Sequence, residues 1–418
     1  MSSPAAQREF AFEVAQKLRG AGFESLWAGG CVRDELLGLT PKDYDVATNA
    51  TPDQIRDLFG HRRTLPIGAA FGVITVLGPR AASQIEVATF RTDATYSDGR
   101  HPDAVHFTTA EHDAQRRDFT INGLFYDPLA KQVIDYVGGQ LDLEQKTIRA
   151  IGDPRLRISE DKLRMLRAVR FAATFNFQID AATLHAIQQM AADIITVSPE
   201  RIGMEIRRML LDPNRARAVK LLRETNLSAP VLPEVAALSP QEFEELCRIL
   251  PVLDKPTLAV AFATLLLPAT NADSRVPQPA SSLGRRLRYT NKEIERAAWL
   301  LTHIRTIANA TNCKWPTVQR LLTNEGAAEL VALREALAGR ADPAVAFCRE
   351  RLAWPPERLN PPQLVDGSDL IRHGLTPSPE FSTLLEKVRD AQLEGEIFTR
   401  NEALALVDRL RTESQTLP

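Results

Sequence analysis

The 418-residue sequence lacks the features of a secreted or membrane-spanning protein. Its four cysteines, Cys31, Cys247, Cys313 and Cys348, are scattered and form no Cys-X-X-Cys or Cys/His pattern with zinc spacing. The longest apolar run, residues 258–267, is about half the ~20 residues that a membrane span needs. The N-terminus shows no basic region followed by an apolar one, as a secretory signal would. These absences predict reduced thiols, a cytoplasmic location and no membrane partner.

An excess of charge of one sign is also lacking, since 51 Lys and Arg face 53 Asp and Glu, for a net charge of −2. This balance excludes a protein whose whole surface is a polycationic nucleic-acid binder. The charge is unevenly distributed, however. Residues 1–152 hold 16 basic and 20 acidic residues, residues 153–223 hold 13 and 8, and residues 224–418 hold 22 and 25. The basic excess over 153–223 fits either a solvated helical face or a local contact with nucleic acid.

The pattern of hydrophobic residues changes near residue 150. The segments before it that are typical of strands are 25–30, 43–48, 72–77, 84–90, 104–107, 119–127 and 131–139, with helical segments at 5–19, 32–38 and 52–60. After Ile151 we expect successive amphipathic helices and no further strand, with breaks at 268–281 and 355–362. One helix should start at Pro199 and stop at 212–214. The sequence therefore predicts an α/β or α+β sheet domain followed by helices.

Two aspartates stand two positions apart in KDYDVAT, Asp43 and Asp45. In a strand, both side chains would project from the same face. Two like charges there are unfavourable unless a cation lies between them, and polymerases place two Mg²⁺ ions ~3.5–4 Å apart in such sites. Glu86, in QIEVATF, could complete the ligation if its strand pairs beside the first. Because Asp-X-Asp is a common pattern, solvated aspartates and an exposed Glu86 remain the alternative.

A predicted strand runs into Gly29-Gly30 and then into a helix that carries Arg33. Such a turn brings bare backbone N–H groups close to a ligand, and an arginine can bind two phosphate oxygens at once. The pattern is neither a Walker loop nor a dinucleotide fingerprint, which argues against an ATPase or a dehydrogenase. An ordinary tight turn is the alternative.

Charged residues also open the segment RRDFTIN, where Arg116 and Arg117 precede a predicted strand. That strand would place Asp118, Thr120 and Asn122 on one face. Adjacent arginines are commonly solvated, but these two lie within the predicted sheet domain. The segment is therefore a candidate part of the same site.

A third charged segment, SEDKLRMLRAVRF, places arginines at every third position: Arg164, Arg167 and Arg170. On a helix these side chains share one side and repel one another. The repulsion is offset if an anion or a base edge lies against them, and Asp161 could act as acceptor beside Arg164 as donor. A solvated helical face with an Asp161–Arg164 ion pair is the alternative.

In order and spacing, residues 23–176 resemble the family of class II tRNA nucleotidyltransferases and bacterial poly(A) polymerases. The segments that carry the resemblance are GGCVRDELLG, KDYDVAT, IEVATFRTDATYSDGRHPDAVHF, RRDFTIN and EDKLRMLRAVRF. A weaker likeness continues through 198–211 and 374–406. The resemblance implies an α+β fold with a polymerase-β-like nucleotidyltransferase domain over 1–150. A helical neck (151–223), body (224–354) and tail (355–418) would follow.

The same resemblance implies Mg²⁺-dependent transfer of a nucleotide from ATP or CTP to the 3′-hydroxyl of RNA, with release of pyrophosphate. Asp43 and Asp45 match the catalytic metal ligands, and Glu86 matches a third acidic position. Gly30 and Arg33 match contacts to the phosphates of the incoming nucleotide.

Further nucleotide contacts are implied in the two arginine-rich segments. Arg116 and Asp118 match the motif that holds the triphosphate and the ribose. Four matched positions lie in EDKLRMLRAVRF, namely Asp161, Arg164, Arg167 and Arg170. The first two match a protein template that pairs with the base of CTP or ATP, and the last two match its flanking contacts.

Members of the family add CCA, only CC or only A to tRNA, or add poly(A) to RNA. Residues 92–102 keep the family's loop at full length, which disfavours CC addition alone. The EDxxR template fits CCA addition, but poly(A) polymerases share much of these segments, so poly(A) or A addition remains an alternative. So does an inactive RNA-binding relative, against which the intact Asp43 and Asp45 argue. The expected partners are tRNA or another RNA 3′ end, recognised by shape and phosphates, with ATP and CTP and without DNA.

Overall fold

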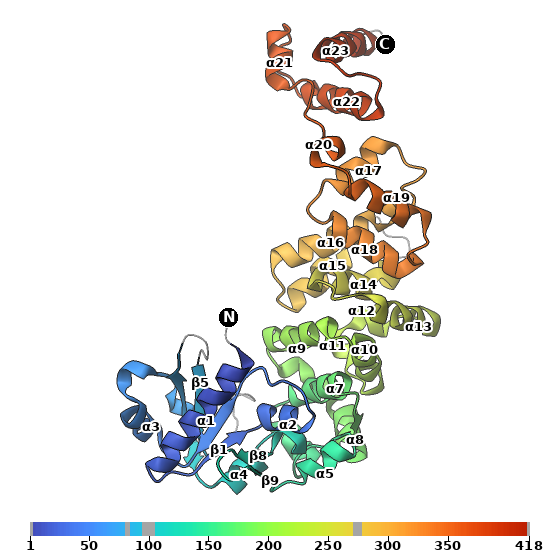
Figure 1. Cartoon of the computed structure of the whole chain (residues 1–418). Coiled ribbons are helices and arrows are strands. Elements are labelled where there is room, and N and C mark those ends of the chain that lie inside the picture. Colours follow the sequence, from blue (N-terminus) through green and yellow to red (C-terminus); the bar gives the residue numbers. More distant parts are fainter. Residues whose placement is uncertain (1–2, 80–83, 94–104, 271–277, 416–418) are drawn as a thin grey trace. The chain divides into compact units, whose positions relative to one another are not determined.

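A computed structural model describes residues 3–79, 84–93, 105–270 and 278–415 (Figure 1). The chain forms two compact units. The first comprises residues 1–243 with 286–288, and the second comprises residues 244–285 with 289–418. A mixed sheet occupies the N-terminal part of the first unit and helices make up most of the rest, so the predicted α+β class is confirmed.

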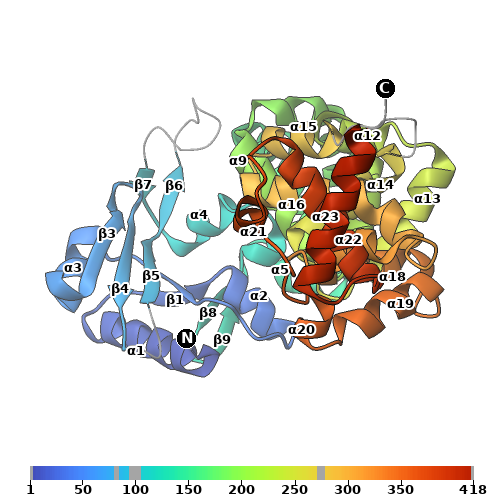
Figure 2. The same cartoon turned by 90° about the horizontal axis from the view of Figure 1, so that it is seen from above.

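The main sheet contains seven strands among the described residues, in the order β3-β4-β5-β2-β1-β8-β9. The strands are β1 (Ser25–Ala28), β2 (Asp45–Thr48), β3 (Thr64–Gly68), β4 (Val73–Leu77), β5 (Gln84–Thr89), β8 (Phe125–Asp127) and β9 (Gln132–Ile134). Neighbouring strands are antiparallel except β2 and β5, which run parallel with Asp45 opposite Glu86. Figure 2 shows this sheet beside the hairpin of β6 (Arg91–Asp93) and β7 (Val105–Phe107).

Helices pack on both faces of the sheet because β1 buries side chains on each side. Helix α1 (Pro4–Gly20) packs against β1, β2 and β5, burying Phe10, Val14 and Leu18 at a spacing of four residues. The opposite face of β1 contributes Leu26 to a cluster with residues of α4 (Ala110–Gln115). Helix α3 (Pro52–Phe59) begins with a capping box and packs on β3, β4 and β5.

Three predicted boundaries are wrong, and each has a local cause. Strand β2 begins only at Asp45, and Asp43 lies in the extended segment before it. Residues 120–122 form the 3-10 helix η3 (Thr120–Asn122) rather than a strand, because their backbone folds onto residues 149–151. Strands also continue past residue 151, since β10 (Thr147–Ile148) pairs with β11 (Gln178–Ile179).

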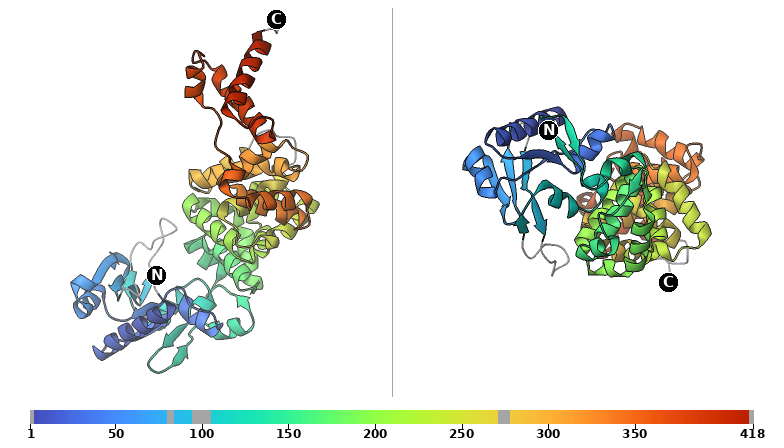
Figure 3. Two further views of the ribbon diagram at one scale, coloured as in Figure 1. Left: turned by 45° about the horizontal axis from the view of Figure 1, so that its top comes forward. Right: turned by 90° about the horizontal axis from the view of Figure 1, so that it is seen from below.

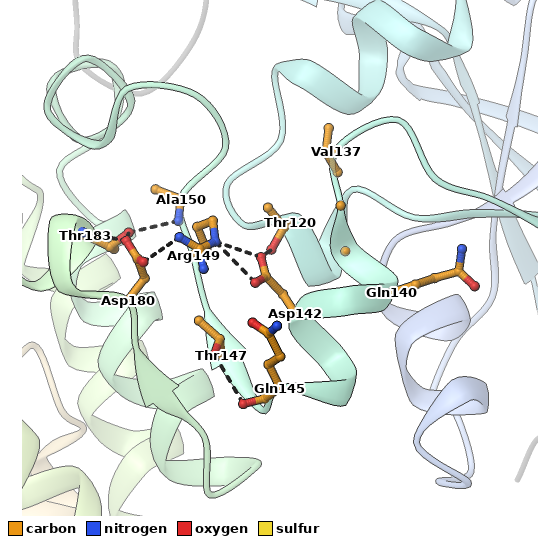
Figure 4. Close-up of polar contacts among 12 residues, drawn as sticks. Thr120, Val137, Gln140, Asp142, Gln145, Thr147, Arg149, Ala150, Asp180 and Thr183 are labelled. Carbon is orange, nitrogen blue, oxygen red and sulfur yellow. Dashed lines mark hydrogen bonds and ion pairs between the residues drawn. The ribbon is translucent and has the colours of Figure 1, made fainter.

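A partly buried polar cluster links η3 to two helices that follow it in the chain (Figure 4). The Thr120 hydroxyl donates to Asp142 at 2.6 Å, in α5 (Gly139–Glu144). Arg149 donates to Asp142 at 3.1 Å and to Asp180 at 2.5 Å. Thr183, in α8 (Ala181–Met190), donates to Asp180 and accepts the backbone N–H of residue 150. These contacts hold η3, which lies close to the pocket residue Asp118 in the sequence.

The first unit contains further helices, one between β1 and β2 and the others after the sheet. They include α2 (Gly30–Leu36), α6 (Pro154–Glu160), α7 (Arg164–Thr174), α9 (Pro199–Leu211), α10 (Arg215–Glu224), α11 (Ser228–Val231) and α12 (Pro233–Ala236). Helix α7 packs against α9 and α10 through its buried residues. The predicted start at Pro199 and stop after Leu211 are confirmed.

The second unit is helical throughout its described residues. Its helices are α13 (Pro240–Ile249, shared with the first unit), α14 (Leu258–Thr270), α15 (Gln278–Arg286), α16 (Asn291–Ala308), α17 (Trp315–Leu322), α18 (Ala327–Ala338), α19 (Pro343–Leu352), α20 (Pro356–Leu359), α21 (Gly367–Arg372), α22 (Glu380–Glu394) and α23 (Arg400–Gln415). The red helices α22 and α23 pack together around a small core that includes Leu384 and Val407 (Figure 3).

Both ends of the predicted break at 268–281 are helical. Helix α14 continues to Thr270 and α15 begins at Gln278, while residues 271–277 lie outside the description. Within the described part of the chain, no helix combines the length and the apolar character that crossing a membrane requires. All four cysteines are free thiols, as predicted.

Candidate active site

A polar pocket of about 660 Å³ lies in the first unit, between the sheet and the arginine-rich helix α7. The lining residues are Gly29, Gly30, Arg33, Asp43, Asp45, Arg91, Arg116, Arg117, Asp118, Asn122, Asp161, Arg164, Arg167, Arg170 and Phe171. The fold therefore brings every predicted site residue except Glu86 to one pocket. Residues 94–104, which hold most of the loop that the sequence singles out, lie outside the described residues.

The acidic part of the site lies at the start of β2. Asp43 and Asp45 both line the pocket, and Glu86 lies opposite Asp45 on the paired strand β5, as predicted. Partial burial and the carboxylates of Asp43 and Glu86 raise the pKa of Asp45 to about 7, although Arg117 lowers it. Among the described residues, no hydrogen bond or ion pair holds these three carboxylates. The negative charges of Asp43 and Glu86 therefore repel that of Asp45.

The residue between the two aspartates faces the other way. Tyr44 is buried, packs edge-on against Trp27 at 5.0 Å between ring centroids, and donates its hydroxyl to Glu35 at 2.7 Å. Glu35 lies on α2 and also accepts a hydrogen bond from Arg8 of α1 at 2.8 Å. This contact on the back of the sheet ties the acidic segment to the helix that carries Arg33.

The predicted strand–Gly–Gly–helix turn is confirmed, with Gly29 between β1 and α2. Gly29 has φ +73°, and a Cβ there would lie 2.7 Å from Nη1 of Arg117. Only glycine tolerates both this backbone conformation and this close approach. Arg33 is buried, and its guanidinium donates to Asn122 at 2.5 Å and to Asp34 at 2.7 Å. The guanidinium group of Arg33 therefore lines the pocket in an orientation that these hydrogen bonds fix.

Asp118 connects the sheet side of the pocket to α7. Its carboxylate accepts hydrogen bonds from Asn122 at 2.9 Å and from Arg167 at 2.8 Å. Burial raises the pKa of Asp118, but the Arg167 guanidinium and these hydrogen bonds outweigh it and hold the pKa at about 2. Asp118 is therefore ionised at neutral pH.

The arginines of α7 are held in ion pairs, so the alternative of a solvated helical face is wrong, whereas their contact with an anion or a base edge stays a prediction. Each has a carboxylate partner from a different element. The three pairs are Arg164–Glu160, Arg167–Asp118 and Arg170–Glu205, at 2.5, 2.6 and 2.5 Å. Their mutual repulsion is offset within the protein, and the guanidinium groups still line the pocket.

Asp161 and Arg164 do not form the ion pair that was the alternative to a template role. Helix α6 ends at Glu160, and Asp161 adopts an extended conformation before α7 begins. Its carboxylate pairs instead with Arg201 of α9 at 2.7 Å. Asp161 and Arg164 nevertheless both line the pocket, each held by a separate partner.

Sequence reasoning passed over three residues that the structure brings to the site: Arg91, Asp113 and Arg201. Arg91 lines the pocket, while Asp113 and Arg201 hold lining residues from behind. A local signal existed only for Asp113, which precedes Arg116 and Arg117 by three and four residues, the spacing of neighbours on a helix. Arg201 lies 40 residues from its partner, and no spacing rule indicates such a pair.

The carboxylates of Asp43, Asp45 and Glu86, which we call the acidic edge, have the chemistry of a divalent-cation site. Carboxylate oxygens are ligands that Mg²⁺ prefers, and a cation would remove the repulsion that raises the pKa of Asp45. Among the described residues, however, no three His, Cys, Asp or Glu side chains are grouped so as to hold a metal ion. Asp43 and Asp45 are the pair that fits, and Glu86 does not line the pocket.

Paired aspartates at the start of β2, a Gly–Gly turn and an arginine-lined wall are together typical of a nucleotidyltransferase site. Residues 26–149 match the family model described as the poly A polymerase head domain. Residues 176–238 match the model described as a probable RNA and SrmB-binding site of polymerase A.

Similar proteins extend this likeness over the whole chain. The CCA-adding enzyme of Lactobacillus helveticus is 32% identical over 94% of this chain and 95% of its own length. The Pediococcus pentosaceus enzyme is 33% identical over 96% of both. Poly(A) polymerase I of Salmonella typhi is 43% identical, but over only 54% of this chain and 50% of its own. The Bacillus stearothermophilus CCA-adding enzyme in complex with CTP has a TM-score of 0.80, 29% identity and full coverage of both chains.

The chain therefore belongs to the family of CCA-adding enzymes and bacterial poly(A) polymerases. The predicted family, nucleotidyltransferase class and fold are confirmed.

Proposed function

We propose that this protein is a tRNA nucleotidyltransferase that adds CCA to the tRNA 3′ end from CTP and ATP. The observation that carries the proposal is the extent of similarity. CCA-adding enzymes align with more than nine-tenths of the chain, including the second unit, whereas the poly(A) polymerase match covers about half. The N-terminal half alone does not discriminate, because the CCA-adding enzyme of Enterococcus faecalis is 42% identical over a similar span.

Asp43 and Asp45 would hold Mg²⁺, which when bound neutralises charge on the triphosphate and favours in-line phosphoryl transfer. The protein itself would supply positioning and electrostatic stabilisation. Glu86 adds negative charge beside Asp45 from the paired strand, consistent with an accessory rather than a lining role. The backbone of Gly30 and the fixed guanidinium of Arg33 would contact the phosphates.

The opposite wall would read the nucleotide. Arg116 and Asp118 are suited to the triphosphate and the ribose, because one is cationic and the other stays ionised. Asp161 and Arg164 would present an acceptor and a donor to the base edge. Two further arginines would flank them, namely Arg167 and Arg170. Helices after residue 150 carry the basic excess where RNA phosphates would bind, in agreement with the RNA-binding family match at 176–238.

The test is an extension assay with transcripts that end in the discriminator base, in C, in CC or in CCA. Each is offered CTP, ATP or both, with Mg²⁺. We expect addition to complete CCA and then to stop, with CTP used before ATP. Long A tracts on unrelated RNA would instead support a poly(A) polymerase, whose 43% identity is confined to about half of the chain. Incorporation at no RNA end would refute both and leave an inactive RNA-binding relative.

A further inference from the structure

Asp113 lies behind the pocket and is not among its lining residues. Its side chain is 2% exposed and contacts two lining arginines, one with each oxygen. Oδ1 accepts from Arg116 Nε at 2.9 Å and Nη2 at 2.8 Å. Oδ2 accepts from Arg117 Nε at 3.2 Å and Nη2 at 3.0 Å. One buried carboxylate thus holds two neighbouring guanidinium groups, each through two nitrogens.

The same carboxylate also holds the backbone. Oδ1 accepts the backbone N–H of Arg91 at 3.2 Å, at the start of β6. Burial raises the pKa of Asp113, but the charges of Arg117 and Arg116 outweigh it and lower the pKa below its ordinary value. Asp113 is therefore ionised at neutral pH and fixes three arginine residues of the lining at one point.

Arg117 shows what this anchoring achieves. Its Nη1 approaches Gly29 so closely that a Cβ would lie 2.7 Å away, and it donates to the backbone oxygen of Asn122 at 3.3 Å. It stacks on Phe125 and lowers the pKa of Asp45. Arg117 therefore lies between the Gly–Gly turn and the acidic edge, where a sideways shift would disturb both.

We propose that Asp113 is a positioning residue for nucleotide binding: it holds Arg116 and Arg117 in the orientation that receives the triphosphate before the nucleotide arrives. The inference rests on the proposed function, since it deepens the assignment of the same pocket. Preorganised guanidinium groups bind phosphate without the cost of ordering two long side chains. Because neither arginine is assigned to the base edge, Asp113 should affect CTP and ATP equally.

The experiment measures binding of CTP and of ATP to the full-length protein with Mg²⁺ and without RNA, by titration calorimetry. The test variant is Asp113→Asn, which removes the charge and keeps the shape. The matched control is Asp135→Asn, because Asp135 accepts only backbone N–H groups at the start of α5, at 2.9 to 3.0 Å, and lies outside the pocket. We expect D113N to weaken both nucleotides by roughly tenfold and by the same factor. The control should change either affinity by less than about twofold.

The positioning role would be overturned if D113N bound the nucleotides as tightly as the wild type does. It would also be overturned if the control variant lost as much nucleotide affinity as D113N. If D113N fails to fold, Asp113→Glu retains the charge but moves the carboxylate by one methylene. Its affinity should then fall between those of the wild type and a loss of roughly tenfold, and an unchanged affinity would also overturn the proposal.

Steady-state kinetics add a second readout. The KM for each nucleotide should rise in D113N, while the KM for tRNA stays unchanged, which a general loss of stability would not produce. The binding assay needs no transfer to RNA. A protein that binds nucleotides through Asp113 but extends no tRNA would therefore refute the proposed function and leave the positioning role standing.

Discussion

The two walls of the pocket differ in how their charges are balanced. On the sheet side, Asp43, Asp45 and Glu86 lie together without an ion-pair partner among the described residues, and the pKa of Asp45 rises to about 7. On the helical side, every arginine of α7 that lines the pocket pairs with a carboxylate from another element.

This difference indicates how each wall is used. Carboxylates left in mutual repulsion gain most from a cation that arrives with the substrate, whereas guanidinium groups already held in place lose little entropy when a ligand binds. Under the proposed function an ion would complete the acidic edge, whereas the arginine wall is already held in place by its ion pairs.

The largest effect should follow from removing charge at the acidic edge. Asp45→Asn, or Asp43→Asn, should reduce nucleotide transfer on the order of a thousandfold or more, because transfer depends on electrostatic stabilisation there. RNA binding, measured by filter retention, should hardly change. Asp57→Asn, at an exposed position of α3, serves as the control. Near-normal transfer in the Asp45 variant would mean that the metal site lies elsewhere.

On the arginine wall, the Arg167–Asp118 pair, which joins α7 to the sheet side of the pocket, should contribute to stability. Arg167→Ala leaves Asp118 buried without its partner and should lower the free energy of unfolding by about 2 kcal/mol, measured by urea denaturation. Because the pKa of Asp118 is about 2, below its ordinary 3.8, the pair contributes fully above pH 3.8 and is lost as the pH falls toward 2. A double-mutant cycle with Asp118→Asn isolates the interaction, and additive effects would show that the pair is energetically neutral.

A smaller effect is expected at the position that would read the base. Arg164→Ala should reduce discrimination between CTP and ATP by roughly tenfold and should change RNA binding less. Single-nucleotide incorporation on transcripts ending in the discriminator base and in CC measures the preference. Arg155→Ala, an exposed arginine of α6, is the matched control. If the nucleotide preference of the Arg164 variant matches that of the control, the template role is wrong.

The last effect concerns pH. In the protein without divalent cations, the pKa of Asp45 lies at about 7, above its ordinary 3.8, so the folded state binds more protons than the unfolded state between these values. The free energy of unfolding should therefore fall as the pH rises from about 4 to 7. Thermal melts in chelator should show this slope reduced in Asp45→Asn but not in Asp57→Asn. An identical slope in both variants would show that the carboxylates of Asp43 and Glu86 do not repel that of Asp45 in the folded protein.

The sequence predicted the residues of the site better than their arrangement. Local patterns sufficed for the strand–Gly–Gly–helix turn at Gly29 and for the pairing of Glu86 beside Asp45, because both follow from strand alternation and glycine chemistry. The alternating pattern of residues 119–122 predicted a strand. In the structure, residues 120–122 form η3, and this segment makes tertiary contacts with residues 149–151.

The partners of the charged side chains could not be predicted in the same way. The spacing of Asp161 and Arg164 suggests a local pair, but the helix breaks between them and Arg201 binds Asp161 from 40 residues away. Glu205, the partner of Arg170, is also distant in sequence. Long-range ion pairs depend on how helices pack, which a single sequence does not specify.

The polar cluster around Arg149 has a consequence for dissecting the molecule. Strand β10 pairs with β11, and Arg149 donates a hydrogen bond to Asp180. The Thr183 hydroxyl accepts a hydrogen bond from the backbone N–H of residue 150. A fragment cut at residue 150 would lose the partner strand of β10, the Asp180 partner of Arg149 and the hydrogen bond from the backbone N–H of residue 151 to the backbone oxygen of Asp118. The shortest piece of this protein that retains a formed pocket must therefore extend through α9, which supplies the partners of Asp161 and Arg170.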